Sequence, residues 1–86
     1  QNLPNPFNPS TTITYEVPES GNVKLVIYNL LGQQIRTLVA DQIEAGFHTV
    51  VWDGSDELGR QVASGIYIYK MDAGSFKATK RMMFLK

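Results

Sequence analysis

The sequence has 86 residues, of which 43% are hydrophobic, 10% aromatic and 19% charged. This length allows one small domain with a single core, and the composition is that of a folded chain, which excludes a disordered tail. Eight basic and eight acidic side chains balance, so the net charge gives no attraction to nucleic acid or to an anionic membrane surface.

Cysteine is absent, which excludes disulfides, thiolate zinc sites and cysteine nucleophiles. No apolar run approaches the ~20 residues of a membrane span, and the first residues lack the charged and apolar regions of a signal peptide. We expect no cofactor. If the domain is exported, the signal lies elsewhere in a longer chain or within the domain itself.

The first ten residues contain Pro4, Pro6 and Pro9, directly before a run of alternating polar and apolar residues. Proline fixes φ and biases the preceding residue towards extended backbone, so this segment forms a stiff connection. We therefore divide the chain into an entry segment or linker over 1–10 and a β-sandwich domain over 11–86. A stiff linker is useful where another domain precedes it.

Short alternating runs, separated by turn signals, follow one another along the rest of the chain. In "TTITYEVP", Ile13, Tyr15 and Val17 share one face of a strand. In "VKLVIYN" both faces carry apolar residues, which indicates a central strand. Gly32 and Gly46 stand where hairpins need positive φ, and a further strand follows each of them.

The strand that ends at Trp52 continues through the loop "DGSDELGR" to "SGIYIYKM", and "DAGS" turns the chain into the last strand, "FKATKRMMFLK". These runs give six strands, with a seventh if the region from Leu38 to Ile43 divides. The pattern predicts an all-β fold, an immunoglobulin or fibronectin type III-like β-sandwich of about seven antiparallel strands. A small barrel is the alternative.

Three carboxylates, Asp53, Asp56 and Glu57, gather in the loop after Trp52 and offer oxygen ligands for calcium. Their spacing departs from the D-x-D-x-D-G calcium loop, and acidic residues are common in strand connections. We therefore predict a turn and no metal site, with calcium as a minor alternative.

His48 is the single histidine, so a Ser-His-Asp triad would have to use it with Asp53 or Asp72. No G-x-S-x-G motif supplies the serine, and one thin core offers no cleft for paired carboxylates. We expect no enzymatic activity.

The aromatic side chains offer another kind of site, a platform for sugars. Alternation places Trp52, Tyr67 and Tyr69 inward, and a domain this small needs its large side chains in the core. We therefore favour the core over a platform, for which Tyr15 and Tyr28 are the other candidates.

Four of the eight basic side chains fall in the last ten residues, which contain no acid. Such charge on an edge strand discourages aggregation. The same basic strand with an apolar end is also a surface that a receptor could bind by charge and by strand addition. Both interpretations stand at this point, and an edge strand also offers a route to self-association. The four residues are Lys77, Lys80, Arg81 and Lys86.

Several stretches of the chain, in the same order, resemble the C-terminal sorting domain of the type IX (Por) secretion system and the related Ig-like domain of flagellar hook-capping proteins. They are "LPNPFNPSTTI", "GNVKLVIYNLLGQQIRTLV", "AGFHTVVWDGSDELGRQVASGIY" and "FKATKRMMFLK". The resemblance covers nearly the whole chain. Its ending departs from the family pattern, with an arginine and paired methionines where many members have a second lysine and aliphatic residues.

The resemblance implies a non-catalytic C-terminal sorting module of a larger secreted protein, which the type IX machinery recognises for outer-membrane translocation and for surface attachment or release. The implied partners are the secretion components and a covalently joined N-terminal cargo domain, with no nucleic acid and no transmembrane segment. The implied location is secreted or at the cell surface, reached via the periplasm. The recognition residues that the resemblance implies are Pro4, Asn5, Pro6, Gly65, Tyr67, Lys80, Arg81, Met82, Phe84 and Lys86.

Two other functions remain at this stage. One is an accessory sandwich on a secreted enzyme, with a structural or weak carbohydrate-binding role, which an exposed row of aromatic rings would favour. The other is assembly like that of a hook cap, in which the domain contacts identical neighbours.

Overall fold

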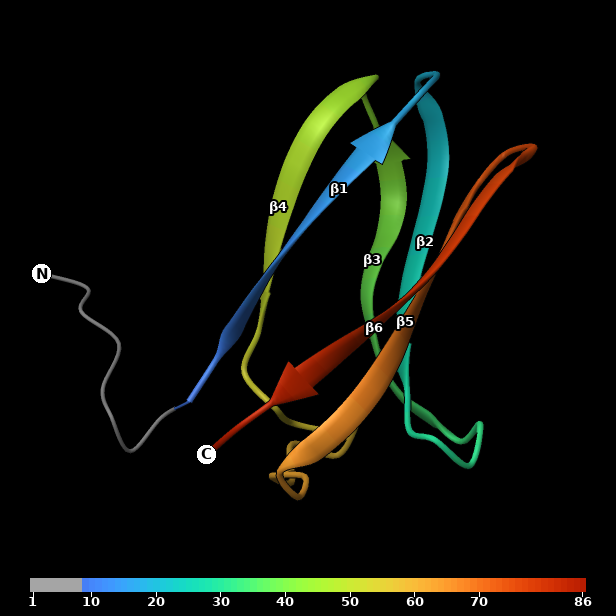
Figure 1. The fold of residues 1–86 in the computed structure, drawn as a ribbon. Helices are drawn as coiled ribbons and strands as arrows, with labels where there is room; N and C mark the ends of the chain where they lie inside the picture. The colour runs from blue at the N-terminus through green and yellow to red at the C-terminus, as the bar shows by residue number, and fades with distance from the viewer. Residues whose placement is uncertain (1–8) are drawn as a thin grey trace, which may run out of the picture.

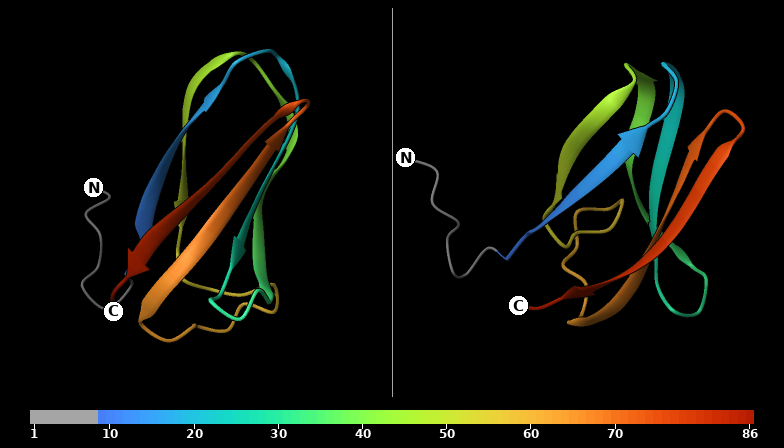
Figure 2. Two further views of the ribbon diagram at one scale, coloured as in Figure 1. Left: turned by 45° about the vertical axis from the view of Figure 1, so that its right-hand side comes forward. Right: turned by 45° about the horizontal axis from the view of Figure 1, so that its top comes forward.

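The computed structural model describes residues 9–86, and its regular structure consists of β-strands (Figure 1). They form a two-stranded sheet of β1 and β4 and a four-stranded sheet in the order β3-β2-β5-β6, and every pair is antiparallel. The two sheets face each other as the layers of a sandwich (Figure 2). The predicted all-β sandwich is confirmed. The strands are β1 (Thr11–Val17), β2 (Gly21–Tyr28), β3 (Gln34–Ile43), β4 (Gly46–Trp52), β5 (Gly65–Ala73) and β6 (Phe76–Phe84).

Six strands are present in residues 9–86, where the sequence left room for a seventh. β3 is continuous, so the region from 38 to 43 does not divide. Its register against β2 shifts between Leu25 and Val26 and again before Tyr28. Such irregularities are β-bulges, which bend a strand and increase its twist. A bent strand of ten residues therefore takes the place of the two shorter strands that the sequence allowed.

One face of each strand points between the sheets, as the alternation of the sequence predicts. Trp52 lies at the centre of an aromatic group, with its ring centroid 5.1 Å from that of Tyr67 and 5.0 Å from that of Phe84. The inward positions predicted for Trp52, Tyr67 and Tyr69 are confirmed. The buried core cluster consists of Ile13, Tyr15, Val17, Val23, Leu25, Ile27, Trp52, Tyr67, Tyr69, Met71 and Phe84.

The two glycines predicted to form hairpins both have positive φ, +81° at Gly32 and +128° at Gly46. In the β2–β3 turn, the side-chain oxygen of Asn29 accepts hydrogen bonds from the N–H groups of Leu31 and Gln33, each at 2.9 Å. The asparagine thus supplies acceptors to two turn amides, which is the usual role of this residue type in turns.

The outer face of the four-stranded sheet is apolar in part. Val26 is buried there, and Tyr28 and Ile68, which pair across β2 and β5, are half-buried. The ammonium group of Lys70 lies 5.1 Å from the centre of the Tyr28 ring. Such a contact is a cation–π interaction, and the lysine stem also covers apolar surface.

Candidate functional site

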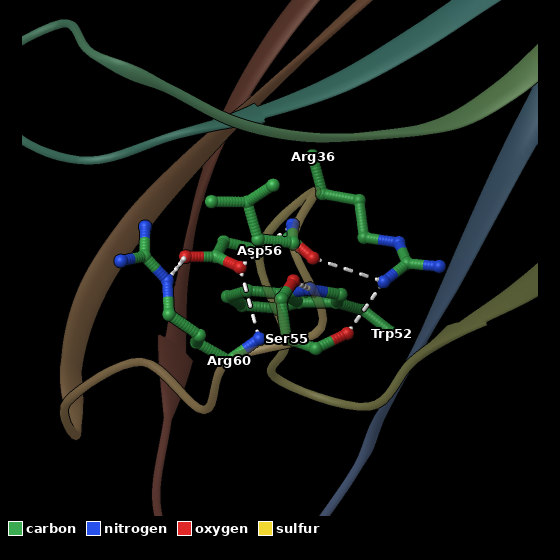
Figure 3. Close-up of polar contacts among 6 residues, drawn as sticks. Arg36, Trp52, Ser55, Asp56 and Arg60 are labelled. Atoms are coloured by element: carbon green, nitrogen blue, oxygen red, sulfur yellow. Dashed lines mark hydrogen bonds and ion pairs between the residues drawn. The ribbon is translucent and has the colours of Figure 1, made fainter.

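The loop between β4 and β5 contains a network of polar contacts that ties the two sheets together (Figure 3). Arg36 extends from β3, and its Nη1 donates to the Ser55 hydroxyl at 2.6 Å and to the Asp56 carbonyl at 3.1 Å. The indole N–H of Trp52, at the end of β4, donates to the Ser55 carbonyl at 2.9 Å. Ser55 is buried, so its polar atoms need these partners.

Asp56 organises the exposed part of this loop. Its Oδ1 accepts hydrogen bonds from the N–H groups of Leu58 and Arg60, each at 2.9 Å, and its Oδ2 lies 3.0 Å from Nε of Arg60 (Figure 3). The N–H of Arg60 favours the charged carboxylate most strongly, and the pKa of Asp56 is therefore below its ordinary value.

Asp53 has a similar role at the start of the loop. Its Oδ1 accepts hydrogen bonds from both the hydroxyl and the N–H of Ser55. The hydroxyl contact is the main reason why the pKa of Asp53 is lowered. Its carbonyl accepts a further bond from the Gln61 side chain at 2.9 Å.

Glu57, the third acid of the loop, binds β3. Its N–H donates to the Ile35 carbonyl, and its Oε1 accepts from the Thr37 N–H, both at 3.0 Å. All three acidic side chains of this loop thus accept hydrogen bonds that stabilise the loop or hold it against β3. This is the role expected of acidic residues in a turn. Residues 9–86 contain no group of three His, Asp or Glu side chains placed to hold a metal ion.

Gly54 allows the loop to pack against the last strand. Its φ is +77°, and a Cβ at this position would lie 2.0 Å from the ring of Phe84. Only a residue without a side chain fits under that ring. Our reading of the sequence missed this contact, although the Asp-Gly pair directly after a strand was a signal for an unusual backbone conformation.

Two of the expected recognition residues, Gly65 and Tyr67, lie where the loop enters β5. The Tyr67 hydroxyl donates to the Ala63 carbonyl at 2.6 Å, and burial raises the pKa of this tyrosine. Gly65 has a φ of +156°, which residues with a side chain rarely adopt, so this position serves the backbone. The tyrosine therefore fixes the local fold and presents little surface to a partner.

The expected basic and apolar block at the end of the chain is divided between the core and two surfaces. Phe84 is fully buried and Met82 packs against the core. Lys80 pairs with Tyr69 and therefore lies on the side of β6 that faces the other sheet, whereas Arg81 lies on the outer side. The backbone N–H of Lys86 donates to the hydroxyl of Ser64 at 3.0 Å. Pro4, Asn5 and Pro6 lie outside the described residues.

His48 is part of the packing on the two-stranded sheet. Its ring stacks on Tyr15 with centroids 5.6 Å apart, and its Nε2 lies 2.6 Å from the Glu44 carbonyl. Within residues 9–86 it has no hydrogen bond to a serine or to a carboxylate. The triad that the sequence would have required is therefore not assembled in the described part of the chain.

A groove of about 350 Å³ lies between the two sheets, on the side where β1 and β6 are the outer strands. Tyr69 and Met71 of β5 form its buried floor. Phe47 and Phe76 form an apolar rim and are 74% and 41% exposed. The groove is lined by Thr14, Tyr15, Glu16, Phe47, Tyr69, Met71, Phe76, Ala78 and Lys80.

Two antiparallel sheets of two and four strands, closed at one end by a buried tryptophan and the loop that follows it, define the class of protein as an Ig-like β-sandwich module. Within this class the family comparison is specific. Residues 7–76 match the FlgD Ig-like domain, and the chain belongs to this family.

Solved structures agree with this family. The fold is similar to that of FlgD from P. aeruginosa, with a TM-score of 0.69 and 22% identity over 87% of this chain. It is also similar to that of FlgD from Xanthomonas campestris, with a TM-score of 0.67 and 22% identity over 90% of this chain. The chain spans 58% of the length of each of these two structures. Comparison with curated protein sequences gives no significant match.

These findings correct the leading functional expectation. The relation to hook-capping Ig-like domains is confirmed, but the assignment to type IX secretion as a C-terminal sorting module is wrong, because the family and the solved structures are those of FlgD. The alternative of an accessory structural or weak carbohydrate-binding domain on a secreted enzyme has no support from these comparisons, and Trp52, Tyr67 and Tyr69 are buried and form no exposed row. None of the described residues forms a helix able to cross a membrane.

Proposed function

We propose that this chain is a non-catalytic Ig-like module that makes protein–protein contacts in a hook-capping assembly. The observation that carries this proposal is the match of residues 7–76 to the FlgD Ig-like domain. The related structure from Xanthomonas campestris is described as giving insight into hook capping, which is essential for flagellar assembly. The module would act as one part of a larger protein.

The use of the polar side chains supports a non-catalytic role. The carboxylates of Asp53 and Asp56 accept hydrogen bonds within their own loop, and His48 stacks on Tyr15. The groups that most often perform acid–base chemistry therefore serve the fold in the described residues. A role in flagellar assembly is also compatible with the secreted or surface location expected from the sequence.

Deletion of residues 11–86 from the full-length protein, in the bacterium that encodes it, tests this proposal. We expect loss of complete hooks in electron micrographs and loss of swimming in soft agar. Immunoblotting must show that the shortened protein is still present. Normal hooks and normal swimming in the deletion strain would contradict a hook-capping role.

Two substitutions in one strand provide a matched pair for the same assay. Phe84→Ala removes a fully buried ring and should impair hook formation as the deletion does, because it strongly destabilises the module. Phe76→Ala removes a ring that is 41% exposed and should leave the fold intact. Normal hooks in both strains would show that assembly does not need the folded module.

A further inference from the structure

The four outer strands of the sandwich differ in how they are protected against pairing with another strand. β1 has one partner, β4, and the two pair without interruption from Thr11↔Trp52 to Val17↔Gly46. The other edge of β1 has no strand partner among residues 9–86. Alternate residues of such an edge direct N–H and C=O groups away from the sheet.

Two of the remaining three edges, those of β3 and β6, are blocked. β3 is bulged, and Glu57 of the β4–β5 loop occupies its edge through bonds to Ile35 and Thr37. β4 contacts β3 beside the two-residue turn that joins them, and the rest of its edge has no strand partner in residues 9–86. β6 carries the inward-facing Lys80, and a charge that points inward from an edge strand prevents pairing with a further strand.

β1 has none of these protections. Its inward side chains, Ile13, Tyr15 and Val17, are apolar and buried, and its outward side chains are two threonines and Glu16. It contains no proline and no bulge. The groove between β1 and β6 lies beside this edge, so a strand added to β1 would direct every second side chain into that groove.

We propose that the free edge of β1 is a docking site for an extended peptide segment of another protein. The segment adds as an antiparallel strand, places apolar side chains over Tyr69 and Met71, and carries a carboxylate that meets Lys80. Main-chain hydrogen bonds supply affinity in this mode of recognition, and the groove supplies specificity. The inference goes beyond hook capping and does not depend on it.

The charge requirement follows from Lys80. It is exposed on the wall of the groove, and the ion pairs of residues 9–86, Arg60–Asp56 and Lys77–Asp72, do not include it. An apolar side chain placed against the ammonium group of Lys80 would displace its water and supply no opposite charge. Such desolvation of a charged group is unfavourable. A carboxylate on the incoming strand would provide that opposite charge.

The direction of the strands places this carboxylate within the peptide. β1 and β6 run in opposite directions (Figure 1), and the centres of the two groove walls are Tyr15 and Ala78. Lys80 therefore lies towards the Ile13 end of β1, and Phe76 lies towards the Val17 end. A peptide antiparallel to β1 begins at the Val17 end, so its apolar residues precede its acid.

These constraints define a probe, the peptide Thr-Val-Thr-Leu-Thr-Glu-Thr, whose second, fourth and sixth side chains face the groove. Fluorescence anisotropy with the labelled peptide and the 86-residue chain should show saturable binding. The same peptide with lysine in place of glutamate should bind about fivefold more weakly. Absence of saturable binding at millimolar protein would overturn the proposal.

Substitutions in β6 identify the contact. Lys80→Glu should reverse the preference between the two peptides, and Lys80→Gln should make it disappear. Arg81→Glu makes the same charge change on the outer side of the strand and should leave the preference as it is. Circular dichroism must show that each variant is folded. A preference that is unchanged in folded Lys80→Glu would contradict the proposed contact.

Amide hydrogen exchange separates strand addition from a side-chain contact. The glutamate peptide should slow exchange at alternate residues of β1, because only the edge amides gain a partner. Unchanged exchange in β1 would contradict strand addition. The chain could instead dimerise as its concentration rises, with slower exchange in β1 and no binding of the peptide. That result would assign the edge to a second copy of the chain and would overturn the proposal of a peptide from another protein.

Discussion

The two ends of the sandwich are held together in different ways. At the loop end, which contains residues 53–64, Trp52 and Phe84 are fully buried and Arg36 reaches Ser55 across the core. The turn end consists of the short connections β1–β2, β3–β4 and β5–β6, and there the hydroxyl of Ser20 accepts from the Ala45 N–H at 2.8 Å. Aromatic packing and the polar network of the loop therefore close the loop end, whereas short connections and a hydrogen bond between two of them hold the turn end, where the groove remains accessible.

The largest effect that this comparison predicts concerns the two phenylalanines of β6. Phe84→Ala at the loop end should lower the free energy of unfolding by about 4 kcal/mol, because it leaves a cavity against Trp52. Phe76→Ala at the turn end should lower it by about 1 kcal/mol, since its ring is already in contact with water. Urea unfolding followed by tryptophan fluorescence measures both, and equal losses would show that the two ends are equivalent.

A second pair compares two glycines with positive φ. Gly54→Ala should lower the free energy of unfolding by about 3 kcal/mol, because the new methyl group adds overlap with Phe84 to the cost of its backbone conformation. Gly74 has a φ of +67° and open space around it, so Gly74→Ala should lower it by about 1 kcal/mol, the backbone cost alone. If Gly74→Ala were the more harmful change in the same urea titrations, the close contact at Gly54 would not matter.

The smallest predicted effect is the pH dependence of the loop end. The pKa of Asp53 is lower in the folded state than its ordinary value, so its ionised form favours folding. This contribution is complete above the ordinary pKa of aspartate and is lost as the pH falls through the lowered folded-state pKa. Thermal unfolding at pH 6 and pH 2.5 should show a smaller acid shift in Tm for Asp53→Asn than for the wild type.

Glu19→Gln, in the β1–β2 turn, is the matched control for this effect because it removes an acid from the turn end. Its acid shift in Tm should exceed that of Asp53→Asn. The reverse order would mean that the hydrogen bonds between Ser55 and Asp53 do not stabilise the charged form.

Most of the fold was predictable because it depends on local alternation. The inward set of β1, the burial of Trp52 and the positive φ at Gly32 and Gly46 each follow from a few neighbouring residues. The continuity of β3 was not predictable from the sequence. Its bulges depend on how β3 pairs with β2, and a few neighbouring residues do not determine that pairing.

The contacts at the loop end also could not be predicted from the sequence. Arg36 meets Ser55, and Phe84 covers Gly54, only after the two sheets have come together. The groove has the same origin, since its walls are strands at opposite ends of the chain. The spacing of residues along the sequence does not predict such contacts between distant strands.

The functional error has a physical explanation. Several of the blocks that resemble sorting domains contain residues that build the sandwich, such as Trp52, Tyr67 and Phe84. Residues of this kind identify a fold shared by several families and do not identify the partner of any one of them. Partner recognition depends on exposed residues, about which these buried residues give no information.

The register of β1 against β4 also has a consequence for how the chain folds. β1 pairs with β4, which begins at Gly46, so more than half of the chain must be made before the first strand has a partner. Pairings between distant segments fold slowly, typically within about milliseconds to seconds for small β-sandwiches. During that interval both edges of β1 are unpaired, and its threonines and Glu16 supply the polar side chains that limit misassociation with other nascent chains.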